Sequence, residues 1–201
     1  MTVPVEICNS ALMRLGVERI TSFSEDTKQS RICKEHYPVA RDHLLAMMPW
    51  PFATVRDQVT PSTATLPFGD GTVYDIPIDC VRVYKVFDTA FNDIRYKIEG
   101  DKLICNETDQ INLVYISNSV NESLYGPIFK EALSLRLAAD MAYTFTKSTS
   151  SRQALLQEAE LVMNRAFSKA SQEVFNDDIG FDYFNNTRRT GPYHTGGQNV
   201  Y

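Results

Sequence analysis

The sequence predicts an α+β fold: a helical bundle of about four helices with an inserted antiparallel β-sheet or small β-sandwich and an extended C-terminal arm. Two segments with helical periodicity, 3–16 and 25–48, precede a run of short alternating strands over 53–118. Two further helical segments, 127–147 and 151–176, follow the strands. Because strands and helices form separate runs, with no alternating βαβ units, we expect the sheet to be antiparallel.

The two N-terminal helices have recognisable ends. Pro4 suits the first turn of the first helix and Gly16 suits its exit. Ser24 is expected to cap the second helix, and Pro38 in its interior predicts a kink or a local break. The residues expected on the buried faces are Ile7, Ala11, Leu12 and Leu15 in the first helix, and Ile32, Cys33, Tyr37, Ala40, Leu44 and Met47 or Met48 in the second.

The segment Pro49-Trp50-Pro51-Phe52 stops the second helix and leads into the strands. Proline has no backbone N–H and restricts the residue before it, so a helix cannot continue through both prolines. Trp50, the only tryptophan, and Phe52 are expected to fill the contact between a helical part, 1–52, and a β part, 53–118. We assign this junction a structural role.

The β part contains five or six short strands at regular spacing. Glu99-Gly100-Asp101 is expected to form the turn of a hairpin. The expected strands are 55–59, 73–77, 81–87, 94–98, 103–105 and 111–116. Simple alternation in the third of these places Val81, Val83 and Lys85 on one face and Arg82, Tyr84 and Val86 on the other.

Residues 119–176 are expected to pack on 1–52 as one discontinuous helical domain. Segment 127–147 is apolar on almost every side, which is typical of a central helix, and its Arg136 and Asp140 are an i,i+4 pair that can satisfy each other. Ser150 and Gln153 predict a capping box for the last helix. The charged face of this helix, and that of the second helix, is either solvated or meets a neighbouring subunit.

The end of the chain, 177–201, has no sustained periodicity. It is rich in aromatic residues, contains a basic pair and has no acid after Asp182. Such a segment cannot bury enough surface to fold alone, yet its aromatics favour an arm that orders on a partner over an end that stays without structure. The residues expected to make the contact are Phe181, Tyr183, Phe184, Arg188, Arg189, Tyr193 and Tyr201.

The composition bounds the possible partners and compartment. With 201 residues and a formal charge of −5, the chain can build an adequate core and has no general basic footprint for nucleic acid. No signal peptide or apolar run of about 20 residues is present, so we expect a cytoplasmic protein without membrane contact. The widely spaced Cys8, Cys33, Cys80 and Cys105 are expected to be reduced, mostly packed thiols rather than metal ligands.

The sequence carries no recognisable catalytic motif, and we assign no catalytic, cofactor-binding or metal-binding residue. His36 and His43 can share a helix face but lack a third ligand, and the only other histidine is His194. A two-carboxylate glycosidase needs only two acids about 5–10 Å apart. The candidates in the β part are Asp70, Asp75 and Asp79, although Asp beside Gly or Pro usually serves turn formation.

The order of residues in the N-terminal part resembles the tail tubular protein A family of short-tailed bacteriophages, the adaptor or gatekeeper between head and tail. The matching stretches are Ile7-Cys8-Asn9-Ser10-Ala11-Leu12, Leu15-Gly16, Ile20-Thr21-Ser22, Glu25-Asp26-Thr27-Lys28, Arg31-Ile32-Cys33, Tyr37, Ala40-Arg41-Asp42, Leu44-Leu45 and Pro49-Trp50-Pro51-Phe52-Ala53. A late helix, with Ala132-Leu133 and Leu137-Ala138-Ala139-Asp140-Met141-Ala142, looks like the central segment of that family, and the total length also agrees.

The resemblance implies a structural role without cofactors. The expected function is a virion protein of the tail, assembled in the host cytoplasm, that forms a homo-oligomeric ring between the portal protein and the tail nozzle protein. The resemblance implies a dodecamer. DNA would pass through the ring without sequence-specific binding, and the arm at 177–201 would dock on the portal.

The sequence leaves two alternatives open. One is a carboxylate-based glycan or peptidoglycan hydrolase associated with the tail, because some members of the resembling family have been credited with such activity. The other is a DNA-binding regulator built on the first two helices. It is disfavoured because the connection between these helices, about eight residues, is longer than a 3–4-residue helix-turn-helix turn.

Overall fold

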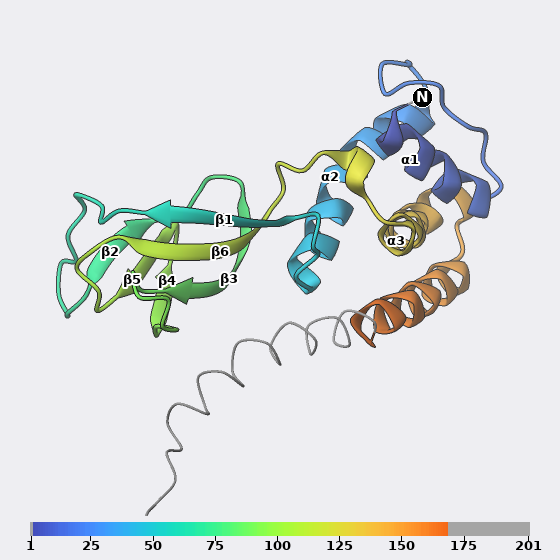
Figure 1. Ribbon diagram of the computed structural model, residues 1–201. Coiled ribbons are helices and arrows are strands. Elements are labelled where there is room, and N and C mark those ends of the chain that lie inside the picture. Colours follow the sequence, from blue (N-terminus) through green and yellow to red (C-terminus); the bar gives the residue numbers. More distant parts are fainter. Residues whose placement is uncertain (1, 169–201) are drawn as a thin grey trace, which may run out of the picture.

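The structure is a computed structural model that describes residues 2–168, which form a helical part and a β part (Figure 1). The helical part contains α1 (Val3–Arg14), α2 (Lys28–Met47), α3 (Pro127–Thr146) and a last helix over 149–168. The predicted α+β class with inserted antiparallel strands is confirmed. The strands are β1 (Thr54–Val59), β2 (Thr72–Asp75), β3 (Cys80–Phe87), β4 (Tyr96–Glu99), β5 (Lys102–Cys105) and β6 (Ile111–Ser117), and the 3₁₀ helix η1 (Glu122–Leu124) follows them.

The start of α2 differs from the sequence prediction. Thr27, not Ser24, is the N-cap: its side chain accepts a hydrogen bond from the backbone N–H of Ser30 at 3.2 Å. Glu25 instead stabilises the loop before α2, because its carboxylate accepts hydrogen bonds from the hydroxyl and the backbone N–H of Thr21. These bonds lower the pKa of Glu25.

Of the kink or local break predicted at Pro38, the break is wrong, since α2 is one helix from Lys28 to Met47. Pro38 and Lys34, whose carbonyl loses its i+4 donor, are both exposed. Water can therefore replace the missing hydrogen bond on that side, which lowers the cost of an interior proline.

The strands form two three-stranded antiparallel sheets, in the orders β1-β6-β3 and β2-β5-β4. The predicted β4–β5 hairpin is present, with Gly100 at φ +64° in its turn. Residues of both sheets share one apolar core: Tyr74, Leu103 and Cys105 from the second sheet, and Val83, Val86, Ile111, Leu113 and Tyr115 from the first.

The simple alternation expected for β3 is wrong. The register of β3 against β6 shifts between Cys80 and Arg82 and again between Val83 and Lys85. As a result Val83 and Val86, three positions apart, are both buried. A bulge adds a residue to one strand and so changes which side chains face the core.

The remaining helices complete a second core. α3 is the central helix, packed against α1 and α2, and its Arg136 and Asp140 form the expected pair at 3.0 Å. The last helix is capped by Ser148, whose hydroxyl accepts from the N–H of Ser151 at 3.2 Å, so the predicted Ser150–Gln153 capping box is wrong. Its buried face consists of Ala159, Val162, Met163 and Ala166. The predicted end of this helix lies outside the described residues.

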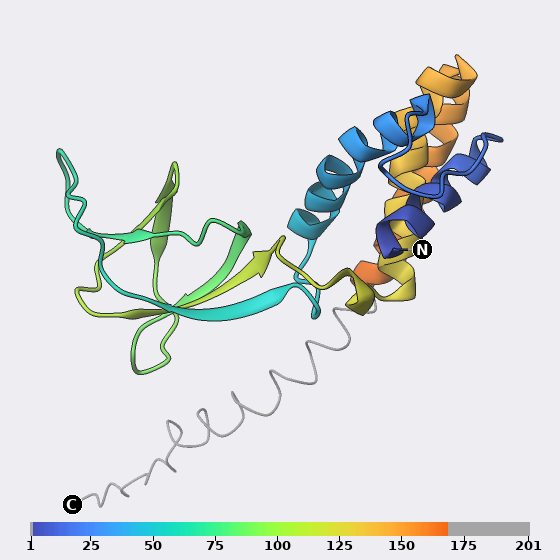
Figure 2. The ribbon, with the colours of Figure 1, turned by 90° about the horizontal axis from the view of Figure 1, so that it is seen from above.

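The β part extends away from the helices and is joined to them by two crossings of the chain, one before β1 and one after β6 (Figure 2). Among the described residues, no helix is long and apolar enough to cross a membrane.

Candidate functional site

An aromatic block packs the two chain crossings against α3. We use this name for Trp50, Phe52, Tyr125 and Phe129, which come from both chain crossings and from α3. The Trp50 ring lies 4.9 Å from Phe129 and 5.7 Å from Phe52, centroid to centroid, and Phe52 lies 5.2 Å from Tyr125. Tilted and edge-to-face aromatic pairs at these distances are favourable beyond the area they bury. The block therefore holds the two crossings together beside α3.

Trp50 also closes the end of α2. The last four carbonyls of a helix lack intrahelical donors. The indole N–H of Trp50, which is 6% exposed, donates to the carbonyl of Leu44 at 2.9 Å. Pro49 is half-buried and Pro51 is exposed, and the helix ends at Met47.

A second residue at the end of α2 comes from the β part and was not identified from the sequence. Arg82 of β3 donates through Nη1 to the carbonyls of Ala46 at 3.1 Å and Met47 at 3.4 Å. A cation is favourable at a helix C-terminus, and α2 has no basic residue in its own last turn. The missing basic residue is the one sequence feature that points to an outside cation at this helix end, but it does not identify the distant residue that supplies the charge.

Two more hydrogen bonds fix the return crossing after β6. The N–H of Ser117 donates to the carbonyl of Ala53 at 2.9 Å. The hydroxyl of Tyr37 on α2 donates to Glu122 of η1 at 3.1 Å. Burial, together with the nearby acidic groups, raises the pKa of Tyr37, so the hydroxyl stays a donor at neutral pH. The junction is thus held by side chains of α2, α3, η1 and β3.

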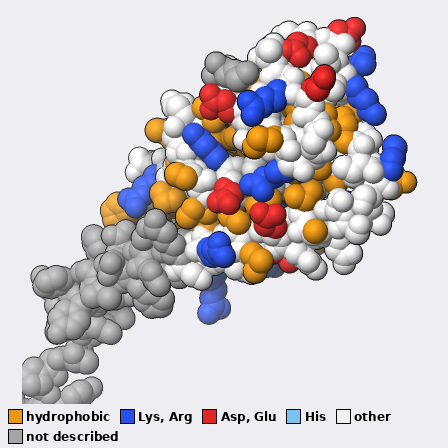
Figure 3. Space-filling model, turned by 90° about the vertical axis from the view of Figure 1, so that its right-hand side faces the viewer, with side chains coloured by type: hydrophobic (Ala, Val, Ile, Leu, Met, Phe, Trp, Pro, Cys, Tyr) orange, Lys and Arg blue, Asp and Glu red, His pale blue; other side chains and the backbone are white. Residues whose placement is uncertain are grey.

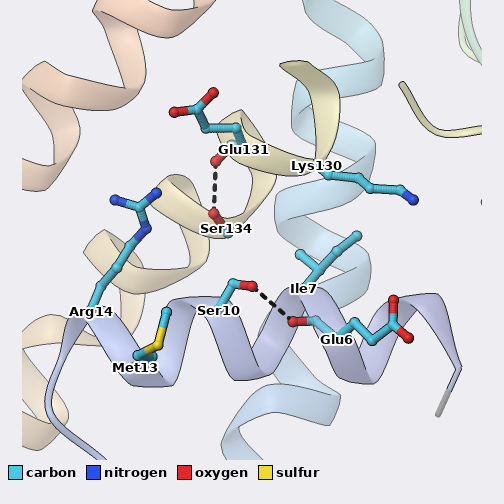
Figure 4. Close-up of a pocket in the computed structure, with 8 residues that line it drawn as sticks. All are labelled: Glu6, Ile7, Ser10, Met13, Arg14, Lys130, Glu131 and Ser134. Atoms are coloured by element: carbon cyan, nitrogen blue, oxygen red, sulfur yellow. Dashed lines mark hydrogen bonds between the residues drawn. The ribbon is translucent and has the colours of Figure 1, made fainter. Parts of the chain in front are cut away.

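An open groove runs between α1 and α3 on the helical part (Figure 4). The hydroxyls of Ser10 and Ser134 both donate to carbonyls of their own helices, at 3.0 Å and 2.8 Å. Neither serine is paired with a base among the lining residues, so these residues provide no activated nucleophile. The groove is lined by Glu6, Ile7, Ser10, Met13 and Arg14 of α1 and by Lys130, Glu131 and Ser134 of α3.

The carboxylates proposed from the sequence have partners typical of structural acids. Asp75 pairs with the ammonium of Lys102 at 2.6 Å. Asp79 accepts from the hydroxyls of Ser117 at 2.5 Å and Tyr115 at 3.2 Å. The third candidate, Asp70, is exposed on the loop before β2.

The histidines and cysteines form no metal site within residues 2–168, where no group of three His, Cys, Asp or Glu could hold an ion. His43 lies 3.3 Å from a guanidinium nitrogen of Arg136. The four cysteines are free thiols, and burial raises the pKa of Cys80 to about 11. His194 lies outside the described residues.

The outer faces of the helices combine charge with exposed apolar side chains. On the face in Figure 3, small groups of basic and acidic side chains lie among apolar ones, and no large area has a single sign. Val39 on α2 is 68% exposed and Leu161 on the last helix is 60% exposed. Arg41 and Asp42 of α2 are half-buried and pair with each other at 2.8 Å.

The predicted arm residues, Phe181, Tyr183, Phe184, Arg188, Arg189, Tyr193 and Tyr201, all lie outside the described residues. No protein-family model matches the chain, and a search of curated proteins finds no match.

Proposed function

We propose that this chain is a structural head-to-tail adaptor of a phage particle, located in the virion tail. In this proposal, copies of the chain form a ring between the portal protein and the tail nozzle protein, and DNA passes through the ring. The observation that carries the proposal is the junction: a helical part and a projecting β part each have their own core, the aromatic block packs the two chain crossings against α3, and Arg82 bonds β3 to the end of α2. Such a chain presents two separate ends in a defined orientation, as a connector requires.

The surface of the helical part supports lateral contacts in a ring. Interspersed charges of both signs favour one register of neighbouring subunits, and exposed apolar residues such as Val39 and Leu161 supply area to bury. Contacts between different faces of identical subunits close into a ring when the rotation permits. The net charge of −5 agrees with a passage in which DNA slides rather than binds.

The test is the mass of complexes in solution. The purified full chain, alone and mixed with the portal protein of the same phage, is measured by light scattering. We expect a ring with a fixed ratio of adaptor to portal subunits, and loss of portal binding when residues 178–201 are deleted. A chain that stays monomeric with both the portal and the nozzle protein contradicts the proposal.

Substitutions on the helices extend this test. Val39→Lys and Leu161→Lys place a charge in the proposed lateral contacts and are expected to prevent ring formation while the chain remains folded. The matched control is Ile78→Lys, because Ile78 is a fully exposed apolar residue of the β part. Rings that form equally in all three variants contradict the assignment of the lateral contacts.

The hydrolase remains the alternative proposal, although no contact of Asp75 or Asp79 favours it. It requires cleavage of glycan or peptidoglycan by the pure chain that is abolished in Asp75→Asn or Asp79→Asn. That result would replace the adaptor proposal.

A further inference from the structure

Three loops leave the same end of the β part. The register pairs Val59 with Ile111 and Phe87 with Asn112, so β1 and β3 end where β6 begins. The loops that connect these strand ends to the rest of the β part therefore lie together, and the first of them projects away from the helices in both views (Figures 1 and 2). We call the three loops, 60–71, 88–93 and 106–110, the distal tip.

The second loop holds a phenylalanine outward in a strained conformation. Phe91 has φ +63° and is 74% exposed. A bulky residue is rarely found in the left-handed region, which favours Gly and Asn. Because the Phe91 ring is exposed, it adds little to the packing of the core. The fold alone therefore gives no reason for phenylalanine at this position.

Hydrogen bonds from Asp88 maintain the turn that carries Phe91. One carboxylate oxygen of Asp88 accepts from the backbone N–H groups of Ala90 and Asn92, both at 2.8 Å, and the other accepts from the Asn92 side chain at 2.8 Å. Asn112 of β6 donates to the carbonyl of Asp88 at 2.8 Å and ties the turn to the sheet. Strained residues that the surroundings hold in place cluster at binding sites. The ring is thus prepositioned for contact with a partner.

The distal tip carries a second exposed aromatic and a predominantly negative charge. Phe68 is 87% exposed on the first loop. The three loops contain five acids, Asp70, Asp88, Asp93, Glu107 and Asp109, and the connection from β3 to β4 adds one base, the exposed Arg95. Tyr74 fixes the third loop by donating to the carbonyls of Glu107 at 2.9 Å and Asp109 at 2.6 Å. Aromatic anchors within a charged rim are typical of protein interfaces.

We propose that the distal tip docks on a protein surface that offers an apolar pocket for Phe91 with Lys or Arg around it. The acids repel nucleic acid and anionic lipid, so the observations favour a protein over either. This inference rests on the proposed function for the choice of partner. In the proposed function the C-terminal segment, which follows the helical part, binds the portal protein. The distal tip belongs to the β part, so we expect its partner to be the nozzle protein.

The test measures binding of the purified nozzle protein to the full-length chain and its variants. Phe91→Asn keeps a residue that tolerates the left-handed turn, so the fold is retained, and it is expected to weaken nozzle binding by at least about 30-fold, as for a central aromatic anchor. Phe68→Ser is expected to weaken it to a smaller extent. The matched control Ile78→Ser removes an exposed apolar side chain at the junction end of the β part and is expected to bind as the wild type does.

Further measurements distinguish a failure of the docking inference from a failure of the proposed function. Higher salt is expected to weaken nozzle binding, and Asp70→Asn with Asp93→Asn is expected to reduce that salt dependence. Phe91→Asn should leave portal binding and ring formation unchanged. If the wild-type chain itself binds no portal protein and forms no ring, that result counts against the proposed function alone. Wild-type affinity of Phe91→Asn for the nozzle protein, or no binding by the wild type, overturns the inference. Phe91-dependent binding to vesicles of neutral phosphatidylcholine instead would assign the tip to membrane contact.

Discussion

Replacing Trp50 by alanine tests whether the aromatic block holds the two parts together. Folding buries about 150–250 Å² of the surface of a core tryptophan side chain. Truncating such a residue to alanine typically lowers the free energy of unfolding by about 3–5 kcal/mol. Trp50 is 6% exposed, touches Phe52 and Phe129, and donates the indole hydrogen bond to Leu44. We therefore expect the full loss of about 3–5 kcal/mol.

The measurement is urea unfolding followed by far-UV circular dichroism, because the variant has no tryptophan fluorescence. With a slope of about 2 kcal/mol/M, the midpoint should fall by roughly 1.5–2.5 M. Trp50→Phe keeps an aromatic ring but loses the indole donor, so its loss should be smaller, about 1–2 kcal/mol. A Trp50→Ala chain that loses less than about 1 kcal/mol and still assembles would refute the reasoning, because the block would then be incidental.

Three further outcomes follow from the described contacts. Arg82→Ala should lower the free energy of unfolding by no more than about 1 kcal/mol, because the side chain is exposed, yet it should change the angle between the two parts measured by small-angle scattering. Gly71→Ala should cost about 1–3 kcal/mol by urea unfolding, since Gly71 has φ +134° and a Cβ there would lie 2.7 Å from a side-chain carbon of β5. Burial raises the pKa of Tyr74 and of Tyr115 to about 12, so the folded chain keeps these protons more strongly than the unfolded chain, whose tyrosines titrate near 10. Stability should be complete below about pH 10 and fall between pH 10 and 12, as followed by tyrosinate absorbance and circular dichroism.

Each of these outcomes has a control. Arg82→Lys retains the positive charge without the guanidinium geometry and should show an intermediate angle. Gly126→Ala is the match for Gly71→Ala, because nothing lies within 4 Å of a Cβ at Gly126 and its φ is not positive. Equal losses in the two glycine variants would contradict the steric argument. Tyrosines that all titrate near pH 10 in the folded chain would contradict the expected pH dependence.

The sequence by itself determined the kinds of elements and most of their order. Helical and alternating periodicities are set by residues a few positions apart, so α3 and the β4–β5 hairpin appear where the pattern predicts them. The end of α2 before Pro49 is likewise local, because a proline removes a donor whatever its surroundings. The central position of α3 followed from the absence of a polar face.

Tertiary structure decided the features that depend on contacts between distant residues. The bulges of β3 are set by its pairing with β6, and the contact of Arg82 with the end of α2 joins residues more than 30 positions apart. The distal tip is also a product of strand register, which brings together three loops that are separate in the sequence. Local propensity cannot specify these pairings, because their free energy comes from packing and hydrogen bonds that exist only after the chain has folded. The elements were therefore predictable, but the joint between the two parts and the proposed docking surface were not.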